Sequence, residues 1–295
     1  MRLRKYHGLG NDYLVLETAA PLDPPLDAAR VRALCDRHRG PGADGVLEPL
    51  PIRRGEDGRF TSQYAVRIWN PDGSRAEKSG NGLRILARWL RDQRAAPPEF
   101  SVEIRTFEQA VGRVRCRVGP PGQGEVEVEM GQARFEAEAV PCARALLDSP
   151  VEIEGVELRL SAVGLGNPHC VVMLDSAQQL DTSPWRAWGA ALEHHPLFPN
   201  RTNVQFVALD AQGPQARIWE RGAGETQASG SSACAVAAVC RRLGRVGEQV
   251  EVRMPGGALQ VSLDAELNVL LRGPVEEVGT FEPAAALLRN PAPGR

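Results

Sequence analysis

The chain has 295 residues, of which 42% are hydrophobic and 24% are charged, and its formal net charge is −2. This length suggests two domains, and a charge so close to zero gives no electrostatic reason to expect a nucleic acid or an acidic membrane surface as a partner. No apolar run approaches the roughly 20 residues that a transmembrane helix needs, and the basic N-terminus lacks the apolar core of a signal peptide. We therefore expect a cytoplasmic protein with no membrane or nucleic-acid partner.

In the first half of the chain, alternating or β-rich segments predict strands and longer amphipathic segments predict helices. Helices are expected at 26–38 and 81–95. Strands are expected at 13–18, 63–70, 101–107, 111–118 and 125–131, with a Pro/Gly-rich turn at 120–124.

After residue 130 the pattern begins again. Strand-like segments, a Gly-Asn-Pro-His turn and helices at 183–195 and 229–244 are followed by further strand-like material at 248–263 and 268–281. We therefore predict an α+β fold of two similar halves. The N-terminal half is residues 1–130 plus 274–289, the C-terminal half is residues 131–273, and the Ala/Pro-rich end from about 285 predicts a frayed tail, placed at 290–295.

Two of the predicted helices differ in character. The helix at 81–95 has arginines between its apolar residues, which predicts an amphipathic helix with one buried face. The helix at 229–244 has only small or apolar side chains from Ser232 to Val239, which predicts burial on all sides.

A Ser-Gly pair comes directly before each of these two helices, and the two serines, Ser79 and Ser229, are 150 positions apart. A helix N-terminus presents unpaired N–H groups and a partial positive charge, and glycine lets a ligand approach closely, so each start suits a carboxylate. Two such starts in a shared cleft would hold a carboxylate with its neighbouring carbon between an acid and a base. That arrangement performs racemisation or epimerisation without a cofactor.

Six cysteines show no CxxC pair, so a zinc site or a disulfide framework is not expected, and buried free thiols are. Lysine occurs only at positions 5 and 78, which leaves few candidates for a Schiff-base cofactor such as pyridoxal phosphate.

Polar side chains lie in Gly/Pro-rich turns, where functional groups tend to be displayed. Each of them also has an ordinary structural explanation, such as a turn, a structural histidine or a salt bridge. These candidates are Asn11, Asp12, Asn70, Asn81, Asn167, His169, Asn203, Glu220 and Arg221.

Taken together and in this order, five stretches resemble the diaminopimelate epimerase family, from Arg4 to about Phe281. They are KYHGLGNDY (5–13), WNPDGSRAEKSGNGLR (69–84), GLGNPHCVV (164–172), RTN (201–203) and ERGAGETQASGSSACA (220–235). The resemblance implies two pseudo-symmetric α/β domains, each a β-barrel-like sheet around a central helix. It also implies epimerisation of LL-diaminopimelate to the meso form on the route to lysine and peptidoglycan, with no cofactor or metal, and a homodimer.

By the same resemblance, residue roles carry over to matching positions. Gly80, Asn81, Gly230 and Ser231 would hold the reacting carboxylate. His169 and Glu220 would help each catalytic group to lose its proton. The residues expected to bind the far end of the substrate or to shape the cleft are Asn11, Asn70, Asn167, Asn203, Glu220 and Arg221.

The chain departs from the family at the acid/base pair itself, because the family has two cysteines where this chain has Ser79 and Ser229. A thiol has a pKa near 8.5 and a serine hydroxyl is closer to water, so the serine anion is about 10 kcal/mol harder to form. Other departures are Gly45, Ile85 and Ser232. Lys78 is an alternative base, but we expect it to be exposed, since neighbours in an extended segment point to opposite faces.

Three functions remain open from the sequence. The first is a diaminopimelate epimerase fold that binds substrate and turns over slowly or not at all. The second is a racemase of another amino acid that uses serine with histidine or glutamate. The third is an amino-acid-binding homologue without catalysis.

Overall fold

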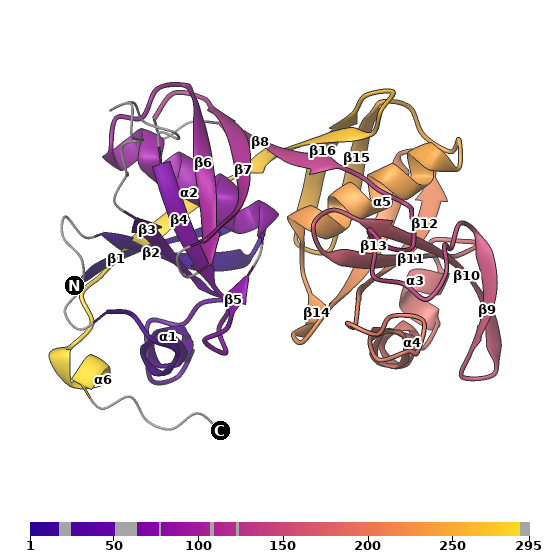
Figure 1. The fold of residues 1–295 in the computed structure, drawn as a ribbon, viewed down its shortest axis with the longest axis horizontal. Coiled ribbons are helices and arrows are strands. Elements are labelled where there is room, and N and C mark those ends of the chain that lie inside the picture. The colour runs from indigo at the N-terminus through magenta and orange to yellow at the C-terminus, as the bar shows by residue number, and fades with distance from the viewer. Residues whose placement is uncertain (18–24, 51–63, 77, 107–108, 122–123, 290–295) are drawn as a thin grey trace. The chain divides into compact units, whose positions relative to one another are not determined.

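A computed structural model of the chain describes residues 1–17, 25–50, 64–76, 78–106, 109–121 and 124–289 (Figure 1). The chain divides into two compact units, Met1–Val128 with Pro274–Arg295 and Glu129–Gly273. Below, these are called unit 1 and unit 2, and each is described by itself.

Unit 1 contains β1 (Arg2–Gly8), β2 (Asn11–Glu17), α1 (Ala28–Cys35), β3 (Val46–Leu50), β4 (Tyr64–Trp69), β5 (Arg75–Ala76), α2 (Gly80–Gln93), β6 (Glu99–Thr106), β7 (Gln109–Val118), the first part of β8 (Glu125–Gln132), β18 (Glu276–Phe281) and α6 (Ala285–Arg289). Unit 2 contains β9 (Ser149–Ile153), β10 (Val156–Gly164), β11 (Pro168–Met173), α3 (Gln179–Thr182), α4 (Trp185–Glu193), β12 (Asn203–Asp210), β13 (Gly213–Glu220), β14 (Gly224–Thr226), α5 (Gly230–Arg242), β15 (Gln249–Met254), β16 (Gly257–Leu263) and β17 (Asn268–Pro274).

The two units repeat one order of strand pairing. In unit 1, β1 and β2 pair antiparallel, β2 and β3 parallel, β3 and β4 antiparallel, and β4 pairs antiparallel with β5 and parallel with β6. In unit 2, β10 to β15 follow the same sequence of orientations. Each parallel pair is joined through at least one helix, as parallel strands require. The helix between β4 and β6 is α2, and its counterpart between β13 and β15 is α5.

These helices are the central elements of their units. The strands around them alternate buried and exposed side chains, most regularly in β8, β15 and β16, so one face of each strand packs inward. Helix α5 contacts β10 to β13 as well as β15 and β16, and α2 contacts β1, β2 and β7 (Figure 1). The predicted α+β fold, with a barrel-like sheet around a central helix in each half, is confirmed.

Burial on all sides is also confirmed for the second site helix, since every residue from Ser232 to Cys240 is buried. The prediction of a single buried face for α2 is wrong. Its residues from Gly80 to Leu90 are all buried, including Arg84 and Arg88. Arg84 donates to the carbonyl oxygen of Pro274, and Arg88 donates to that of Pro120 at 2.7 Å, so hydrogen bonds within the unit replace the water that these guanidinium groups lose.

The other predicted helices are present as α1 and α4, and every predicted strand corresponds to an observed one. The short helices α3 and α6 were not predicted. Helix α6 begins at Ala285, where the composition predicted a frayed end, because Leu287 and Leu288 pack against the apolar core beneath α1. The predicted tail, 290–295, lies outside the described residues.

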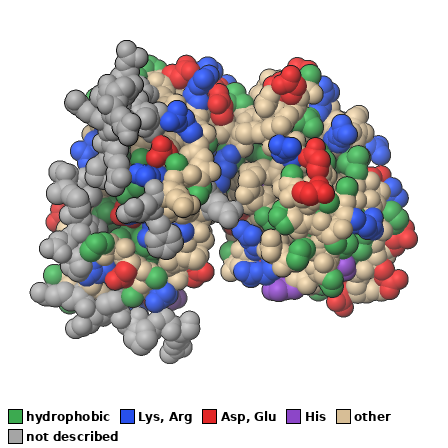
Figure 2. Space-filling view, viewed as in Figure 1, with side chains coloured by type: hydrophobic (Ala, Val, Ile, Leu, Met, Phe, Trp, Pro, Cys, Tyr) green, Lys and Arg blue, Asp and Glu red, His purple; other side chains and the backbone are tan. Residues whose placement is uncertain are grey.

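All six cysteines are buried, as predicted. On the face drawn in Figure 2, the acidic and basic side chains of the described residues are interspersed. Among the described helices, none combines the length and the apolar character that a membrane span requires.

Candidate functional site

Ser79 is the N-cap residue of α2. Its extended backbone, with φ −140° and ψ 115°, turns the side chain back over the first helical turn, where Oγ accepts a hydrogen bond from the Gly82 N–H at 3.0 Å. The Tyr13 hydroxyl lies 3.0 Å from the same Oγ. The helix start therefore directs an N–H dipole at the serine oxygen, which favours negative charge there. Lys78 is half-buried, which corrects the expectation that it is exposed.

Asn81 fixes the α2 start to the turn between β1 and β2. Its Nδ2 donates to Oδ1 of Asn11 at 2.9 Å and to the carbonyl of Gly8 at 3.2 Å, while its Oδ1 accepts from Arg84. Asn81 and Arg84 are buried. The structure thus brings the predicted residues Asn11, Gly80 and Asn81 together at one end of α2.

A charge cluster lies behind Asn11. The Asn11 amide donates to Asp44 at 2.9 Å, and Arg37 donates to both Asp12 and Asp44. Burial opposes ionisation of Asp12, but hydrogen bonds from Arg37 and Lys5 outweigh it and lower its pKa to about 2. Burial, together with the charge of Asp12, raises the pKa of Asp44. This cluster holds the β1–β2 turn and hence Asn11.

Asn70 lies apart from this group in its hydrogen bonding. Its amide donates to Oγ of Ser74 at 2.9 Å, and its carbonyl accepts from the Gly73 N–H. These bonds close the turn after β4 that leads to β5 and then to Ser79.

Ser229 is the N-cap residue of α5, with φ −144° and ψ 125°, and it is buried. Its backbone matches that of Ser79, but its side chain makes no capping hydrogen bond with the helix. The first N–H groups of α5, at Gly230, Ser231 and Ser232, precede the first main-chain bond of the helix, from Ala233 to Ser229. N–H groups at a helix N-terminus such as these can bind a carboxylate.

His169 occupies the buried end of unit 2. Its Nε2 lies 3.0 Å from Oδ1 of Asn167, and its Nδ1 lies 3.1 Å from Nε2 of Gln205. Gln205 also donates to Oγ of Ser232 in α5 at 3.0 Å. Burial lowers the pKa of His169 to about 3, assisted by the charge of Arg221, although the hydrogen bond with Gln205 acts in the opposite direction. The imidazole is therefore neutral at pH 7, with a partner at each ring nitrogen.

Asn203 connects the strand that carries His169 to the turn after β13. It pairs with His169 across the parallel β11–β12 ladder, and its amide donates to the carbonyl of Pro168 at 2.9 Å. Its Oδ1 accepts from the Arg221 N–H at 3.0 Å. Glu220 ends β13 and accepts from the Ala223 N–H through its carbonyl. Asn167, His169, Asn203 and Arg221 thus meet in unit 2.

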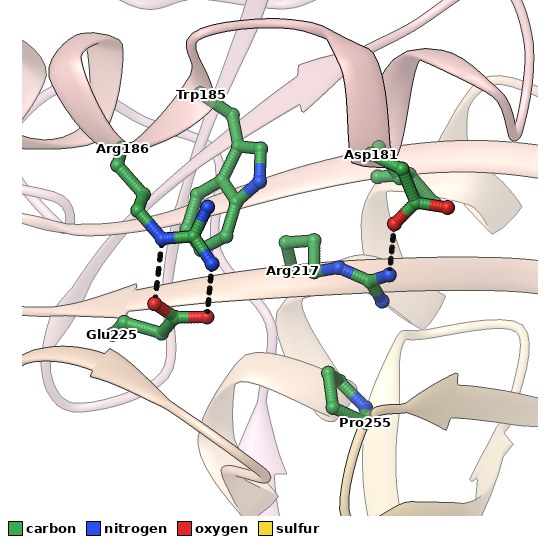
Figure 3. Close-up of a pocket in the computed structure, with 7 residues that line it drawn as sticks. Asp181, Trp185, Arg186, Arg217, Glu225 and Pro255 are labelled. Atoms are coloured by element: carbon green, nitrogen blue, oxygen red, sulfur yellow. Dashed lines mark hydrogen bonds and ion pairs between the residues drawn. The ribbon is translucent and has the colours of Figure 1, made fainter.

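A cavity of about 290 Å³ lies elsewhere in unit 2 (Figure 3). It is lined by two ion pairs, Arg186 with Glu225 and Arg217 with Asp181, so its charged groups neutralise each other. None of the predicted site residues lines it. Within the described ranges, no group of three or more His, Cys, Asp or Glu side chains is arranged to hold a metal ion.

The fold is shared with solved structures of racemases and epimerases. The crystal structure of a protein named "probable proline racemase", from Agrobacterium radiobacter K84, superposes with a TM-score of 0.69 at 17% identity, over 98% of this chain and 94% of that one. A hydroxyproline epimerase from Agrobacterium vitis superposes with a TM-score of 0.66 at 17% identity, over 95% and 91%. At this identity the likeness establishes the fold.

Sequence relationships identify the family. The diaminopimelate epimerase family model matches residues 3–136 and 161–278. "Diaminopimelate epimerase 2" of Nostoc sp. (strain PCC 7120) is 38% identical over 288 residues, which cover 96% of this chain and 95% of the relative. The diaminopimelate epimerase of Azotobacter vinelandii is 38% identical, over 94% of this chain and 97% of the relative. The chain belongs to the diaminopimelate epimerase family and is an isomerase of the epimerase class.

Sequence reasoning missed two residues of these networks, Tyr13 and Gln205. Tyr13 lies within the KYHGLGNDY stretch, but nothing local indicates that its hydroxyl meets Ser79. Gln205 is a buried polar residue in the first half of β12, among largely apolar neighbours, and that contrast is the signal that identifies it.

Proposed function

We propose that the chain epimerises the α-carbon of an amino acid, converting LL-diaminopimelate to the meso form, with Ser79 and Ser229 acting on opposite faces of one carbon. The observation that carries this proposal is the position of the two serines. Each is the N-cap residue of the central helix of its unit, at equivalent points of a repeated strand order. The curated relatives bear the name of that activity.

The substrate carboxylate would bind mainly at the start of α5. Its first N–H groups donate no hydrogen bond to the Ser229 side chain, whereas the Gly82 N–H of α2 already donates to the Ser79 side chain. Helix α5 also has two basic residues in its last turn, Arg241 and Arg242. Their positive charges interact favourably with the negative, C-terminal end of the helix dipole. The N–H groups of Gly80 and Asn81 would supply the second contact with the carboxylate.

In the chemical step, one serine oxygen would take the α-proton while the other hydroxyl delivers its proton to the opposite face. The Cα–H bond breaks, a new Cα–H bond forms with inverted configuration, and the two serines exchange protonation states. The weak acidity of the hydroxyl makes this step slow compared with the same step on thiols, since about seven pKa units separate the two groups.

The remaining residues would recognise the substrate and shape the site. Asn11 and Asn70 in unit 1 and Asn167, Asn203, Glu220 and Arg221 in unit 2 are placed in this role by their positions in the family's motifs. His169 is weakly basic and bonded at both ring nitrogens, which favours a positioning role for it, through Asn167. By the same family resemblance we infer a cytoplasmic homodimer that acts on the route to lysine.

The test is α-proton exchange in D₂O. The purified chain is incubated with LL-diaminopimelate, with meso-diaminopimelate and with proline as an unrelated amino acid, and deuterium at Cα and configuration are followed by NMR and chiral chromatography. Deuterium uptake with inversion of diaminopimelate supports the proposal, and the Ser79→Ala/Ser229→Ala variant is the control that must lose it. Thermal stabilisation by diaminopimelate without exchange would instead identify a binding protein and overturn the catalytic step.

A further inference from the structure

The side chain of Ser79 contacts the hydroxyl of Tyr13, a contact that the sequence did not predict. Tyr13 lies in β2 and is only 6% exposed, and its Oη is 3.0 Å from Oγ of Ser79. Because Oγ also accepts from the Gly82 N–H at 3.0 Å, the serine hydroxyl joins the helix start to the phenol.

Gly45 leaves room for the tyrosine ring. A Cβ placed on Gly45 would lie 2.5 Å from Cε1 of Tyr13 and 2.4 Å from the carbonyl oxygen of Trp69, and both distances are too short for any real contact. Gly45 is not among the glycines with positive φ, so its backbone does not require glycine. The space taken by the Trp69 carbonyl and the Tyr13 ring does, and this accounts for one of the departures from the family pattern.

A count of hydrogen-bonding capacity shows what the pair can do. A serine hydroxyl has one proton to donate and two lone pairs, and one lone pair is taken by Gly82. If Tyr13 donates into the second lone pair, the serine proton is left to point at a substrate. If Ser79 donates to Tyr13, a serine lone pair is left to face the substrate. The two hydroxyls therefore form a chain that carries a proton in either direction.

We propose that Tyr13 is a positioning residue that takes up and returns the proton of Ser79, so that the phenol rather than the serine alkoxide bears the charge. The inference rests on the proposed epimerase function. In one direction, the Cα–H bond breaks, the α-proton joins Oγ of Ser79, and the serine proton passes at the same time to the Tyr13 phenolate. In the other direction, Ser79 protonates the carbanion, and the phenol, which becomes phenolate, reprotonates Ser79.

The acidities explain why such a relay helps. A phenol has a pKa of about 10, whereas a serine hydroxyl is close to water at about 15.7. Passing the proton to Tyr13 therefore removes about six orders of magnitude from the unfavourable ionisation that the serine alone requires. Within the part of the chain that the structure describes, the Ser229 side chain makes no capping bond comparable to that of Ser79.

The experiment compares Tyr13→Phe with the wild type in the D₂O assay. We expect inversion to fall about 100-fold or more with KM changed less than about threefold, because the ring remains and only the relay is lost. The stereoisomer whose α-proton faces Ser229 still exchanges that proton for deuterium, and it keeps its configuration. Tyr64→Phe, which removes a hydroxyl elsewhere in unit 1, is the matched control.

A pH profile separates the relay from a merely structural role. The active base in the wild type is the tyrosinate, so kcat/KM rises with pH and levels off once the phenol is ionised. In Tyr13→Phe the base is the Ser79 alkoxide, which forms only at much higher pH, so kcat/KM continues to rise over the same range from a lower level. Inversion at wild-type rates in Tyr13→Phe, or profiles of the same shape in both proteins, overturns the relay and leaves the epimerase function standing. Absence of exchange in the wild type with every amino acid overturns the proposed function and the relay with it.

Discussion

The start of α2 and the start of α5 have the same sequence pattern and the same backbone, yet their side chains are used differently. At α2, Ser79 accepts from the helix and contacts Tyr13, and Asn81 is bonded to Asn11, Gly8 and Arg84. At α5, the Ser229 side chain makes no capping bond with its helix, and the buried Ser232 accepts a hydrogen bond from Gln205. The Ser79 side chain is therefore bonded within its own unit, whereas the Ser229 side chain does not cap its helix.

The two starts therefore share a position in the fold but differ in their side-chain contacts. The repeated strand order determines where both helices begin, and the residues packed around each start decide what its serine does. In unit 1 the Oγ of Ser79 is bonded to a phenol and to an N–H group of its helix, which under the proposed relay prepares it for proton transfer. In unit 2 the Ser229 side chain makes no capping bond, and the proposed function assigns the start of α5 to the carboxylate.

The largest expected effect comes from restoring thiols at both starts. Ser79→Cys together with Ser229→Cys should raise the rate of diaminopimelate epimerisation about 10³-fold or more, because a thiolate is far easier to form than an alkoxide. Epimerisation is measured by chiral chromatography. Each single substitution is the control, and we expect it to fall well short of the pair, since both faces of the carbon need a proton carrier. A folded double variant that binds no diaminopimelate would refute the substrate assignment.

The second effect concerns the buried histidine of unit 2. His169 has a folded pKa of about 3 against 6.5 in the unfolded chain, so the unfolded state binds the proton first as pH falls. Stability from this group is complete above pH 6.5 and is lost towards pH 3, by up to about 5 kcal/mol. Denaturant unfolding at pH 7, 5.5 and 4 should show a shallower decline in His169→Gln than in the wild type. The exposed His194→Gln variant should decline like the wild type, and equal declines in all three would refute this account.

Unit 1 should respond to acid over a lower pH range. The pKa of Asp12 is lowered from 3.8 to about 2, so its contribution is complete above pH 3.8 and is lost as pH falls to 2. The contribution is about 2 kcal/mol, and it is absent in Asp12→Asn. Unfolding curves between pH 4.5 and 2 test this, with Asp175→Asn, at an exposed position in unit 2, as the control. A loss already complete at pH 5 would contradict the assignment.

The smallest effect compares the two caps directly. Ser79→Ala removes the bond to the Gly82 N–H and should cost about 1 kcal/mol of unfolding free energy. Ser229→Ala removes no capping bond and should therefore cost less than Ser79→Ala. Denaturant unfolding of both variants at pH 7 gives the comparison. Equal losses would mean that the two N-cap serines act alike.

Much of the fold was predictable from local pattern. The two site helices, the helices at α1 and α4 and the regular strands were recognised because periodicity reports which side chains face inward. The burial of α2 on all sides was not predictable, because arginines such as Arg84 and Arg88 normally indicate a solvent-exposed face. In the structure, the backbone carbonyls of Pro274 and Pro120 accept their hydrogen bonds. Helix α6 was missed for the same reason, since its apolar contacts are with core residues more than 200 positions earlier in the chain.

The sequence by itself determined the repeated halves, the two Ser-Gly helix starts and the family, because turns, caps and periodicity depend on neighbouring residues. Only the tertiary structure decided how each serine is used. The contacts that distinguish the two starts join residues that are distant in the chain. They are the bond between Tyr13 and Ser79, the close approach of Tyr13 to Gly45, and the bonds of Gln205 with His169 and Ser232. Hydrogen bonds depend on distances of about 3 Å between specific atoms, and such distances are set by packing rather than by local sequence.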